Sequence, residues 1–428
     1  MSQPYEAQTI TPGEKGHSSE AVGYLLSRFG LIVLLGFLLI AAWNGQVVIV
    51  ILLGLALSAA GLARLWSRLS LVGVHCQRFL NEQRAFPGEN IELRLRLANR
   101  KLLPLPWVQV DDEIPDQLAP IDTSLPPGSR PGFSLLSHAG ALLWYTGINW
   151  RYHLRCQKRG YYTLGPIKVT SGDIFGLYPR STTQPLTDHV IVYPRLFPIA
   201  QLGIPSLYPL GETRAERRIF EDHTRTIGVR DYSPHDSLRH IHWKASARHQ
   251  KLQVKVFEPT TTLKVALFLA VDSFQGDGVS DDDFELGISA AASIANYAIE
   301  QDSQVGLFVN SRLRDSGQPI RIPPGGGLHQ LINILEALAK VVSVSSSSFE
   351  GFFQEGWGSL PWGTTLILVI ARPSAALPEL LTSLREAGYK SVVIQIGEPE
   401  GEGAEQATAW YNITGTGDLI GLASGGSR

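Results

Sequence analysis

Two uncharged apolar runs near the start of the chain constrain its architecture more than any other feature. Phe29–Trp43 is apolar throughout, and Val47–Ala63 is apolar apart from Ser58 and a few glycines. Each run approaches the roughly 20 residues that a helix needs to cross a bilayer, and the turn-forming stretch Asn44–Gln46 separates them. Lipid cannot satisfy backbone polar groups, so we expect two antiparallel transmembrane helices within residues 23–68.

The basic residues around these runs predict the orientation of the helices. Lys15 and Arg28 precede the first run, Arg64 and Arg68 follow the second, and no charge lies between the runs. Basic residues stay on the cytoplasmic side of a membrane. We therefore expect residues 1–22 to be a cytoplasmic tail of a multi-pass protein in the inner (plasma) membrane, with its soluble domains in the cytoplasm. A cleaved signal peptide and a buried soluble helical hairpin are the alternatives.

Residues 71–200 change to a period of two. Ile91–Leu97 alternates apolar and polar side chains, as a half-buried strand does. Further strands are expected at Trp107–Val110, Tyr152–Cys156, Ile167–Val169 and Val190–Tyr193. Several short strands separated by turn residues predict an immunoglobulin-like β-sandwich.

Residues 260–397 alternate buried strands with helices. Strands are expected at Leu263–Val271, Gln304–Asn310, Thr365–Ala371 and Lys390–Ile396, and helices at Asp281–Glu300, Leu328–Leu338 and Leu377–Ala387. Ser280 and Asp283 have capping-box spacing at the start of the first helix. This order predicts an α/β domain with a mainly parallel sheet. We expect a loop at Ser343–Ser348 and a Gly-rich tail over residues 398–428.

Composition excludes two classes of protein. The 428 residues carry a net charge of −2, so the molecule as a whole is not built to coat nucleic acid. The two cysteines, Cys76 and Cys156, cannot form the disulfide framework of a small secreted protein. Free buried thiols or a single bridge both remain open.

Residues 211–256 contain the densest group of charged and aromatic side chains. Arg214–Lys255 holds ten basic and five acidic residues in a chain whose net charge is −2. Within it, Gly228–Arg248 carries the most distinctive residues, which are Arg230, Asp231, Tyr232, Asp236, Arg239, Trp243, Lys244 and Arg248. This block resembles the signature of the DUF58 family of membrane-anchored proteins. The turn Arg159–Pro166 and the run Asp173–Leu177 resemble a second feature of that family, and we expect Phe175 and Gly176 to pack against the signature.

The resemblance implies a von Willebrand factor A-like fold for the C-terminal region. It also implies a partnership with AAA+ ATPases of the MoxR type. Many von Willebrand A-like domains hold Mg²⁺ through Asp-x-Ser-x-Ser, because carboxylate and hydroxyl oxygens suit that ion. Here Phe274 and Gly276 replace both serines after Asp272. We therefore expect a degenerate metal site, in which Asp272 accepts hydrogen bonds from backbone amides instead.

Four interpretations of the signature remain open. Arg230 and Arg239 can pair with nearby carboxylates and lock a domain junction, with Trp243 as a buried anchor. The same residues can instead form a partner-binding surface. Asp236, His240 and His242 can ligate a transition metal in an enzyme, since the two histidines of His-x-His share a face of a strand. Binding of nucleic acid or anionic lipid is the fourth, although interspersed carboxylates disfavour it.

These observations together predict a membrane-anchored scaffold or adaptor that is not an enzyme and needs no cofactor. The expected fold is a two-helix transmembrane hairpin, an immunoglobulin-like β-sandwich and a degenerate von Willebrand A-like α/β domain. The expected partners are the lipid bilayer and a MoxR-type AAA+ ATPase, with no nucleic acid. The alternative function is a metal-dependent enzyme that uses Asp236, His240 and His242.

Overall fold

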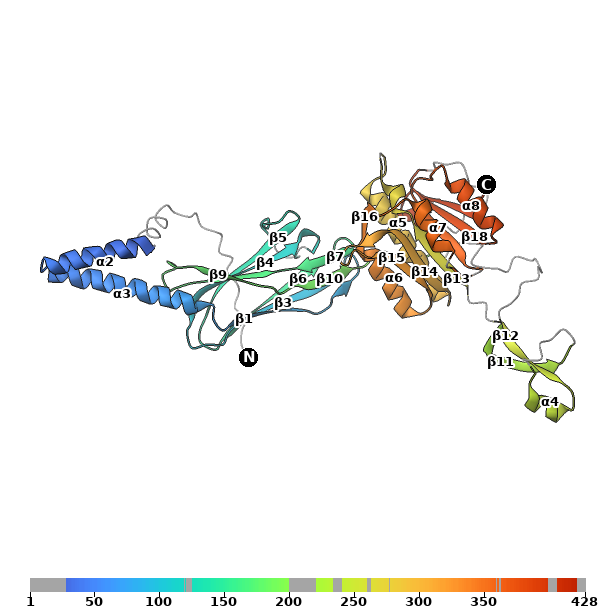
Figure 1. Cartoon of the computed structure of the whole chain (residues 1–428), viewed down its shortest axis with the longest axis horizontal. Coiled ribbons are helices and arrows are strands. Elements are labelled where there is room, and N and C mark those ends of the chain that lie inside the picture. The colour runs from blue at the N-terminus through green and yellow to red at the C-terminus, as the bar shows by residue number, and fades with distance from the viewer. Residues whose placement is uncertain are drawn as a thin grey trace. The chain divides into compact units, whose positions relative to one another are not determined.

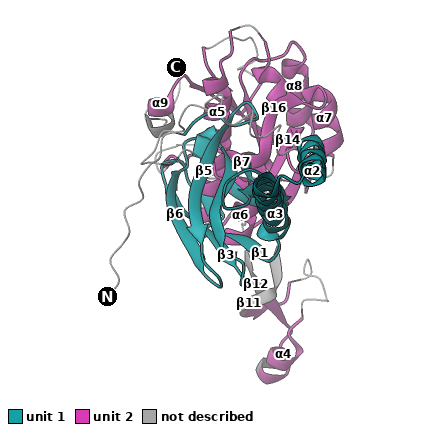
Figure 2. Cartoon of the chain, turned by 90° about the vertical axis from the view of Figure 1, so that its left-hand side faces the viewer, with its two compact units in different colours: residues 1–158, 162–190 teal, residues 159–161, 191–428 magenta. Residues whose placement is uncertain are grey.

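A computed structural model describes residues 28–118, 120, 125–199, 221–233, 241–259, 263–276, 278–358, 360–361, 363–398 and 406–421 (Figure 1). The chain divides into two compact units (Figure 2). Unit 1 comprises Met1–Lys158 and Tyr162–Val190, and unit 2 comprises Arg159–Tyr161 and Ile191–Arg428.

Two apolar helices begin the described part of unit 1. They are α2 (Arg28–Trp43) and α3 (Val47–Ser70), and the predicted turn joins them, with Gly45 at φ +70°. Within the described residues, α3 is the one helix that is long and apolar enough to cross a membrane, and α2 is apolar but shorter. Most large apolar side chains on both helices are exposed, and Trp43 is 93% exposed. A core helix of a soluble protein would bury this surface, so α3 is a candidate membrane span.

Strands β1 to β10 form three sheets in the orders β1-β3-β6, β5-β4-β8-β9 and β2-β10-β7. The neighbouring strands within the first two sheets are antiparallel. The bounds are β1 Val74–Leu80, β2 Arg84–Ala85, β3 Asn90–Asn99, β4 Leu105–Pro115, β5 Phe133–Leu142, β6 Gly147–Arg155, β7 Gly160–Leu164, β8 Ile167–Ser171, β9 Arg180–Gln184 and β10 Asp188–Val192, with a 3-10 turn at Asp116–Leu118. All five strands expected in this region are present.

The alternating pattern buries one face of each of the first two sheets in a shared core. Cys76 and Leu95 from the first sheet lie in one buried cluster with Val108 and Ile167 from the second. Cys76 and Cys156 are both free and buried, as the first alternative predicted. Burial raises the pKa of both thiols to about 11, because an apolar site disfavours the thiolate. Both cysteines therefore act as small apolar core residues.

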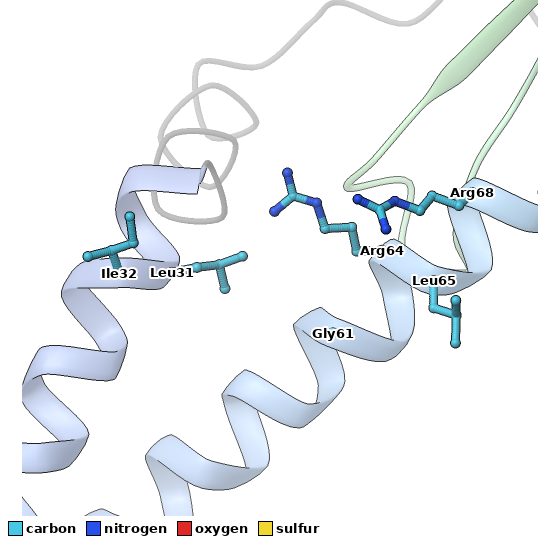
Figure 3. A pocket seen from close by; sticks show the side chains of 6 residues that line it. All are labelled: Leu31, Ile32, Gly61, Arg64, Leu65 and Arg68. Atoms are coloured by element: carbon cyan, nitrogen blue, oxygen red, sulfur yellow. The ribbon is translucent and has the colours of Figure 1, made fainter.

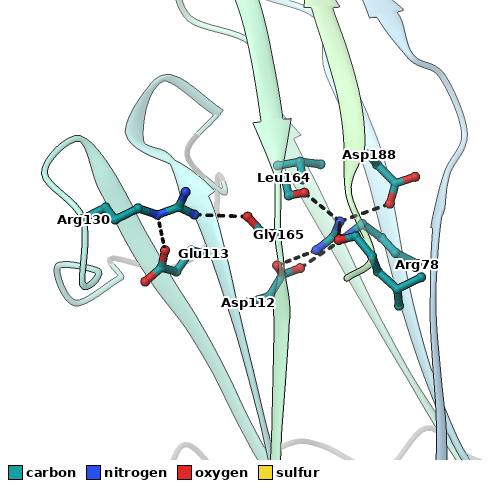
Figure 4. A network of polar contacts seen from close by, with 8 residues as sticks. Arg78, Asp112, Glu113, Arg130, Leu164, Gly165 and Asp188 are labelled. Atoms are coloured by element: carbon teal, nitrogen blue, oxygen red, sulfur yellow. Dashed lines mark hydrogen bonds and ion pairs between the residues drawn. The ribbon is translucent and has the colours of Figure 1, made fainter. Parts of the chain in front are cut away.

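A buried arginine interrupts the apolar face of β1 (Figure 4). The Arg78 side chain has no exposed surface, and its guanidinium donates to both carboxylate oxygens of Asp112, at 2.5 and 3.2 Å. It also donates to Asp188 at 3.1 Å and to the carbonyl oxygens of Leu164 and Leu186 at 3.2 and 3.3 Å. These contacts join strands β1, β4, β7 and β10. All three nitrogens of the guanidinium therefore donate to a carboxylate or a carbonyl oxygen.

The motifs Arg159–Pro166 and Asp173–Leu177 each contain a residue that the local backbone requires. Gly165 has φ +93°, and a Cβ there would meet the Leu186 carbonyl oxygen at 2.2 Å, so only glycine fits. The buried carboxylate of Asp173 accepts from the backbone amides of Phe175 and Tyr178 at 3.0 and 2.7 Å, which folds the following loop. Phe175 is 70% exposed, so its own unit does not cover the ring, and its packing against the signature stays a prediction.

A seven-stranded sheet forms the centre of unit 2. Six strands follow the order β15-β14-β13-β17-β18-β19, and β16 pairs with β14. Strands β14, β13, β17, β18 and β19 are parallel, and β15 and β16 run antiparallel to β14. The bounds are β13 Lys264–Leu269, β14 Gln304–Leu313, β15 Pro319–Gly325, β16 Val341–Ser345, β17 Thr365–Ile370, β18 Lys390–Ile396 and β19 Ala409–Ile413. The chain thus adds strands on one side of β13 and then on the other, as a doubly wound sheet does.

The helices of unit 2 follow the predicted periodicity. Their bounds are α5 Asp281–Glu300, α6 Leu328–Lys340, α7 Phe349–Trp357, α8 Leu377–Glu386 and α9 Thr416–Gly421. Helix α5 begins at the predicted residue, and both hydrogen bonds of the Ser280–Asp283 capping box are present. Small and apolar residues of its inner face, including Ala291 and Ile294, are buried.

Three elements differ from the sequence-based expectation. The serine-rich stretch expected to be a loop forms part of β16, where Ser345 pairs with Ser311 at the end of β14. Helix α7 was not expected. Residues 409–413, assigned to a Gly-rich tail, form the parallel strand β19 beside β18. These short elements have weak periodicity and obtain their partners from the folded sheet.

We predict that removing one partner of the Arg78–Asp112 ion pair destabilises the protein. Asp112→Asn should lower the free energy of unfolding by about 3–5 kcal/mol, because it removes the bidentate, fully buried countercharge of the guanidinium and leaves only the partly exposed Asp188. The double variant Arg78→Met/Asp112→Leu should be more stable than Asp112→Asn. Chemical denaturation of each variant measures this, with Arg94→Gln, which breaks an exposed pair with Glu92, as the control that changes little. Equal stability of Asp112→Asn and Arg94→Gln would contradict the prediction.

We predict an acid-dependent loss of stability from His138. Its ring stacks on Trp150 and Tyr152, at 5.2 and 4.9 Å between centroids, and burial lowers its pKa to about 4. The unfolded chain, with a histidine pKa near 6.5, binds the proton more tightly. His138 should therefore have no effect above that pH and should reduce stability as pH falls from about 6.5 to about 4.

Denaturation midpoints measured at pH 7 and pH 4.5 test this expectation. The difference between the two midpoints should shrink in His138→Phe, which keeps an aromatic ring in the stack. His153→Gln, at an exposed position on β6, is the matched control and should leave the difference unchanged. An unchanged difference in His138→Phe would rule out a role for this ring.

Candidate functional site

The signature folds into a small antiparallel hairpin that carries a short helix. Strand β11 (Glu221–Asp231) pairs with β12 (Gln253–Pro259), and α4 (Trp243–His249) lies between them in sequence. Ile241 bridges to Val254, and both side chains are buried. Two register shifts interrupt β11 before Gly228. The hairpin therefore has its own small core.

The polar residues inside the hairpin position α4. His242 Nδ1 accepts the Ala245 N–H at 3.1 Å and so caps the helix N-terminus. Ser246 Oγ accepts the Gln253 N–H at 2.9 Å and donates to the His242 carbonyl at 3.1 Å. Gln253 Nε2 donates to the Asp231 carboxylate. Ser246 and one nitrogen of His242 thus hold the fold together.

The outer side of the hairpin presents the residues expected of an interaction surface. Trp243 is 69% exposed on this hairpin, and its role as a buried anchor at a domain junction stays a prediction. Arg230, Lys244 and Arg248 are exposed as well, and Arg230 donates to the carbonyl of neighbouring Asp231 at 3.3 Å. Tyr232 is half-buried, and its backbone N–H donates to the Leu252 carbonyl at 2.9 Å. Asp236, Arg239 and His240 lie outside the described residues.

A second candidate site lies at the carboxyl edge of the sheet of unit 2. Strand order reverses between β13 and β17, and ligands of open α/β sheets bind in the crevice at such a reversal. A cavity of about 220 Å³ opens there. Its lining residues are Ala270, Asp272, Ser273, Gln275, Phe349, Glu350, Ile370, Arg372, Pro373, Ser374 and Leu377. Most of them directly follow β13 or β17, or begin α7.

Asp272 accepts three N–H donors at this edge. Its Oδ1 accepts from Asn310 Nδ2 at 2.8 Å and from the Ser273 amide at 3.1 Å. Its Oδ2 accepts from the Phe349 amide at 2.7 Å, at the positive N-terminus of α7. The expectation that Asp272 accepts backbone amides is therefore confirmed. These donors compete with a metal ion for the same lone pairs.

Phe274, which stands at the first serine position of the Asp-x-Ser-x-Ser pattern, has a role in packing. Phe274 is buried and packs against Phe284, with 5.6 Å between ring centroids. A Cβ on Gly287 would lie 2.6 Å from the Phe274 ring, so α5 accepts the phenyl group through a glycine. The described residues include no group of three His, Cys, Asp or Glu side chains that could hold a metal ion. The residues at this edge do not fit a Mg²⁺ site of the Asp-x-Ser-x-Ser kind.

Sequence reasoning missed two arginines of unit 2. Arg372 lines the cavity, but a single arginine after a strand gives no signal in a sequence. Arg159 makes a bidentate ion pair with Glu285 of α5, at 2.8 and 2.9 Å. It also donates to the Leu338 and Val341 carbonyls at 2.9 and 3.1 Å, at the C-terminus of α6. The signal for Arg159 in the sequence was its place in the Arg159–Pro166 motif. Its role is to donate hydrogen bonds to the free carbonyl oxygens at the end of α6.

Gly228–Arg248 of the signature and Asp272 at the sheet edge lie within a region that matches a known family. Residues 228–351 match the family described as "Protein of unknown function DUF58". The chain is 24% identical over 249 residues to the "Uncharacterized protein YeaD" of Bacillus subtilis (strain 168), and the match covers 58% of each chain. The chain thus spans 58% of that relative's length.

The solved structures that match this chain have low TM-scores. Proximal thread matrix protein 1 from the mussel byssus has a TM-score of 0.28 and 14% identity over 38% of this chain and 45% of its own. A β-glucosidase from Listeria innocua in complex with isofagomine has a TM-score of 0.18 and 15% identity over 28% of this chain and 16% of its own. Similarities this low carry no argument about fold or function. The match over residues 228–351 and the YeaD relative together support membership of this chain in the DUF58 family.

Proposed function

We propose that this protein is a membrane-anchored, non-enzymatic adaptor that presents its signature hairpin to a protein partner. The partner that family resemblance favours is an AAA+ ATPase of the MoxR type, acting in the assembly or maturation of a protein complex. The observation that carries the proposal is the 69% exposure of Trp243 on a small, separately cored hairpin. Exposed apolar surface rimmed by polar residues is typical of interaction sites, and Val229 and Leu252 of the same hairpin are also exposed, at 41% and 45%.

The chemistry of the hairpin supports a protein partner with an acidic surface. Tryptophan, tyrosine and arginine are the residues most enriched among those that dominate binding energy. Trp243 supplies apolar area, and exposed Arg230, Lys244 and Arg248 surround it in sequence with positive charge. Arginine forms bidentate contacts with carboxylates, which favours aspartate and glutamate on the partner.

The proposed anchor is a transmembrane hairpin made of α2 and α3, with both ends in the cytoplasm. The exposed apolar surface of the two helices and the basic Arg64 and Arg68 at the end of α3 support it. The shared core of two antiparallel sheets supports an immunoglobulin-like sandwich. The reversal of strand order at β13 supports a von Willebrand A-like α/β domain.

A metal-dependent enzyme that uses Asp236, His240 and His242 is the weaker candidate. His242 Nδ1 already accepts a backbone N–H, which leaves Nε2 as its only nitrogen for a metal. Elemental analysis of purified protein tests this candidate directly. One bound transition metal per chain that is lost in His242→Ala would favour the enzyme over the adaptor.

We predict that Trp243→Ala abolishes capture of the ATPase without unfolding the hairpin. Truncating a central aromatic side chain commonly costs about 2–4 kcal/mol of binding free energy, or roughly 30-fold or more in affinity. Full-length protein is extracted in mild detergent and tested for binding to the purified MoxR-type ATPase. Thermal denaturation should be unchanged, because the side chain is mostly exposed.

Two variants sharpen this experiment. Trp144→Ala removes another tryptophan, 56% exposed in unit 1, and should leave binding unchanged. Arg230→Ala separates the two structural interpretations of the signature. Loss of binding with normal folding supports a surface role, whereas failure to fold supports a junction lock. Full binding by Trp243→Ala would refute the proposed surface.

We also predict that protease added outside intact cells leaves the strands β1 to β10 uncleaved. The β strands follow α3 directly and would lie inside the cell if both helix ends are cytoplasmic. Protease added to opened cells should cleave the same sites, which is the control for accessibility. Cleavage in intact cells, or recovery of the full chain without detergent, would overturn the proposed anchor.

A further inference from the structure

The end of the helix pair contains a cavity that the proposed function does not use (Figure 3). It measures about 440 Å³ and lies between the start of α2 and the later turns of α3. Its lining residues are Leu31, Ile32, Gly61, Arg64, Leu65 and Arg68. The cavity therefore combines an apolar wall with two positive charges.

The two charges suit one anionic group. Arg64 and Arg68 are four residues apart, so their side chains leave the same face of α3 on consecutive turns. Figure 3 shows both guanidinium groups on the side where α2 begins. Neither has an ion-pair partner among the residues that the structure describes, and no carboxylate lines the cavity. Two adjacent guanidinium groups favour a phosphate, whose oxygens accept from both.

The rest of the cavity suits a hydrocarbon chain. Leu31, Ile32 and Leu65 line it with apolar surface. Gly61 lies one turn before Leu65, and a Cβ at this position would have nothing within 4 Å. The missing side chain leaves open space on α3 below the arginines. An occupant that fits both parts has a phosphate head and an apolar tail.

The depth of the arginines matches the surface of a bilayer. Val47 and Arg64 are 17 steps apart in sequence, which is roughly 26 Å of helix at 1.5 Å per residue. The hydrocarbon core of a bilayer is about 30 Å thick. If Val47 lies near one face, Arg64 and Arg68 lie at the headgroups of the other.

A loop of unit 1 lies at the same level. Ser67 Oγ donates to the Tyr178 carbonyl at 2.5 Å, and the Arg64 guanidinium carbon lies 5.6 Å from the centroid of the Tyr178 ring. In the same loop Ile174 and Phe175 are 58% and 70% exposed. Tyrosine is enriched at the membrane interface, which suits Tyr178, and the exposed Ile174 and Phe175 add apolar surface beside it. The sheet loop and the arginines therefore indicate one plane for the lipid headgroups.

We propose that this cavity binds one anionic glycerophospholipid of the cytoplasmic leaflet. Arg64 and Arg68 hold the phosphate, and an acyl chain lies against Leu31, Ile32 and Leu65 in the space left by Gly61. The inference rests on the membrane anchor of the proposed function. It assigns a specific lipid site where a transmembrane helix alone requires only a hydrophobic surrounding.

Full-length protein in a neutral detergent provides the test. Native mass spectrometry is used to titrate it with phosphatidylglycerol or with phosphatidylcholine. We expect phosphatidylglycerol to bind more tightly, because the lining residues that the structure describes offer no carboxylate to a choline group. Each basic residue near a headgroup contributes roughly fivefold in affinity, so Arg64→Gln/Arg68→Gln should weaken binding about 25-fold. Arg96→Gln/Arg151→Gln makes the same charge change on exposed strand positions and should have no effect.

A steric variant separates the cavity from charge alone. Gly61→Leu keeps both arginines and places a side chain in the open space, and helix propensity favours leucine over glycine. It should lose phosphatidylglycerol binding while the thermal stability of the lipid-free protein is retained. Equal binding of the two lipids, unchanged binding in either cavity variant, or full competition by inorganic phosphate would each overturn the lipid site. A chain that stays soluble without detergent would instead overturn the membrane anchor itself.

Discussion

The buried guanidinium of Arg78 is the constraint on which the first unit depends. A charge without solvent is unfavourable unless its donors are all satisfied. The surrounding strands supply the carboxylates of Asp112 and Asp188 and two carbonyl oxygens, at distances between 2.5 and 3.3 Å. Gly165 belongs to the same arrangement, because any side chain there would collide with the Leu186 carbonyl. Four strands must therefore reach their native positions together before this charge is stabilised.

In the second unit, hydrogen bonds stabilise the carboxylate of Asp272 in a comparable way. Asp272 follows β13 at the carboxyl edge of the sheet, and its oxygens accept the Asn310 side chain and two backbone amides. One of these amides begins α7, so the negative charge also complements that helix terminus. Phe274 packs against α5 and requires Gly287 opposite it. At this edge, Asp272 connects β13, β14 and α7.

Strong local patterns in the sequence were sufficient for most of the fold. The Ser280 capping box fixed the start of α5, and continuous apolar runs located β13, β17 and β18. Helix α7 and strands β16 and β19 escaped prediction, because glycines weaken the periodicity of α7, serines weaken that of β16, and β19 is too short to show a period. The same limit applied to the candidate site. Residue types identified the signature, but the exposure of Trp243 depends on tertiary structure, and a lone Arg372 has no pattern around it.

The junction between α3 and β1 determines how the first unit is held. Only Leu71–Gly73 separate the helix from the strand. Lys101 Nζ donates to the carbonyl oxygens of Ser70 and Val72, and Ser67 is tied to Tyr178. A flexible tether would let the sheets swivel freely and absorb a pull. This short connection, held by hydrogen bonds on two sides, restricts such rotation. A force applied to the sheets is therefore transmitted to α3.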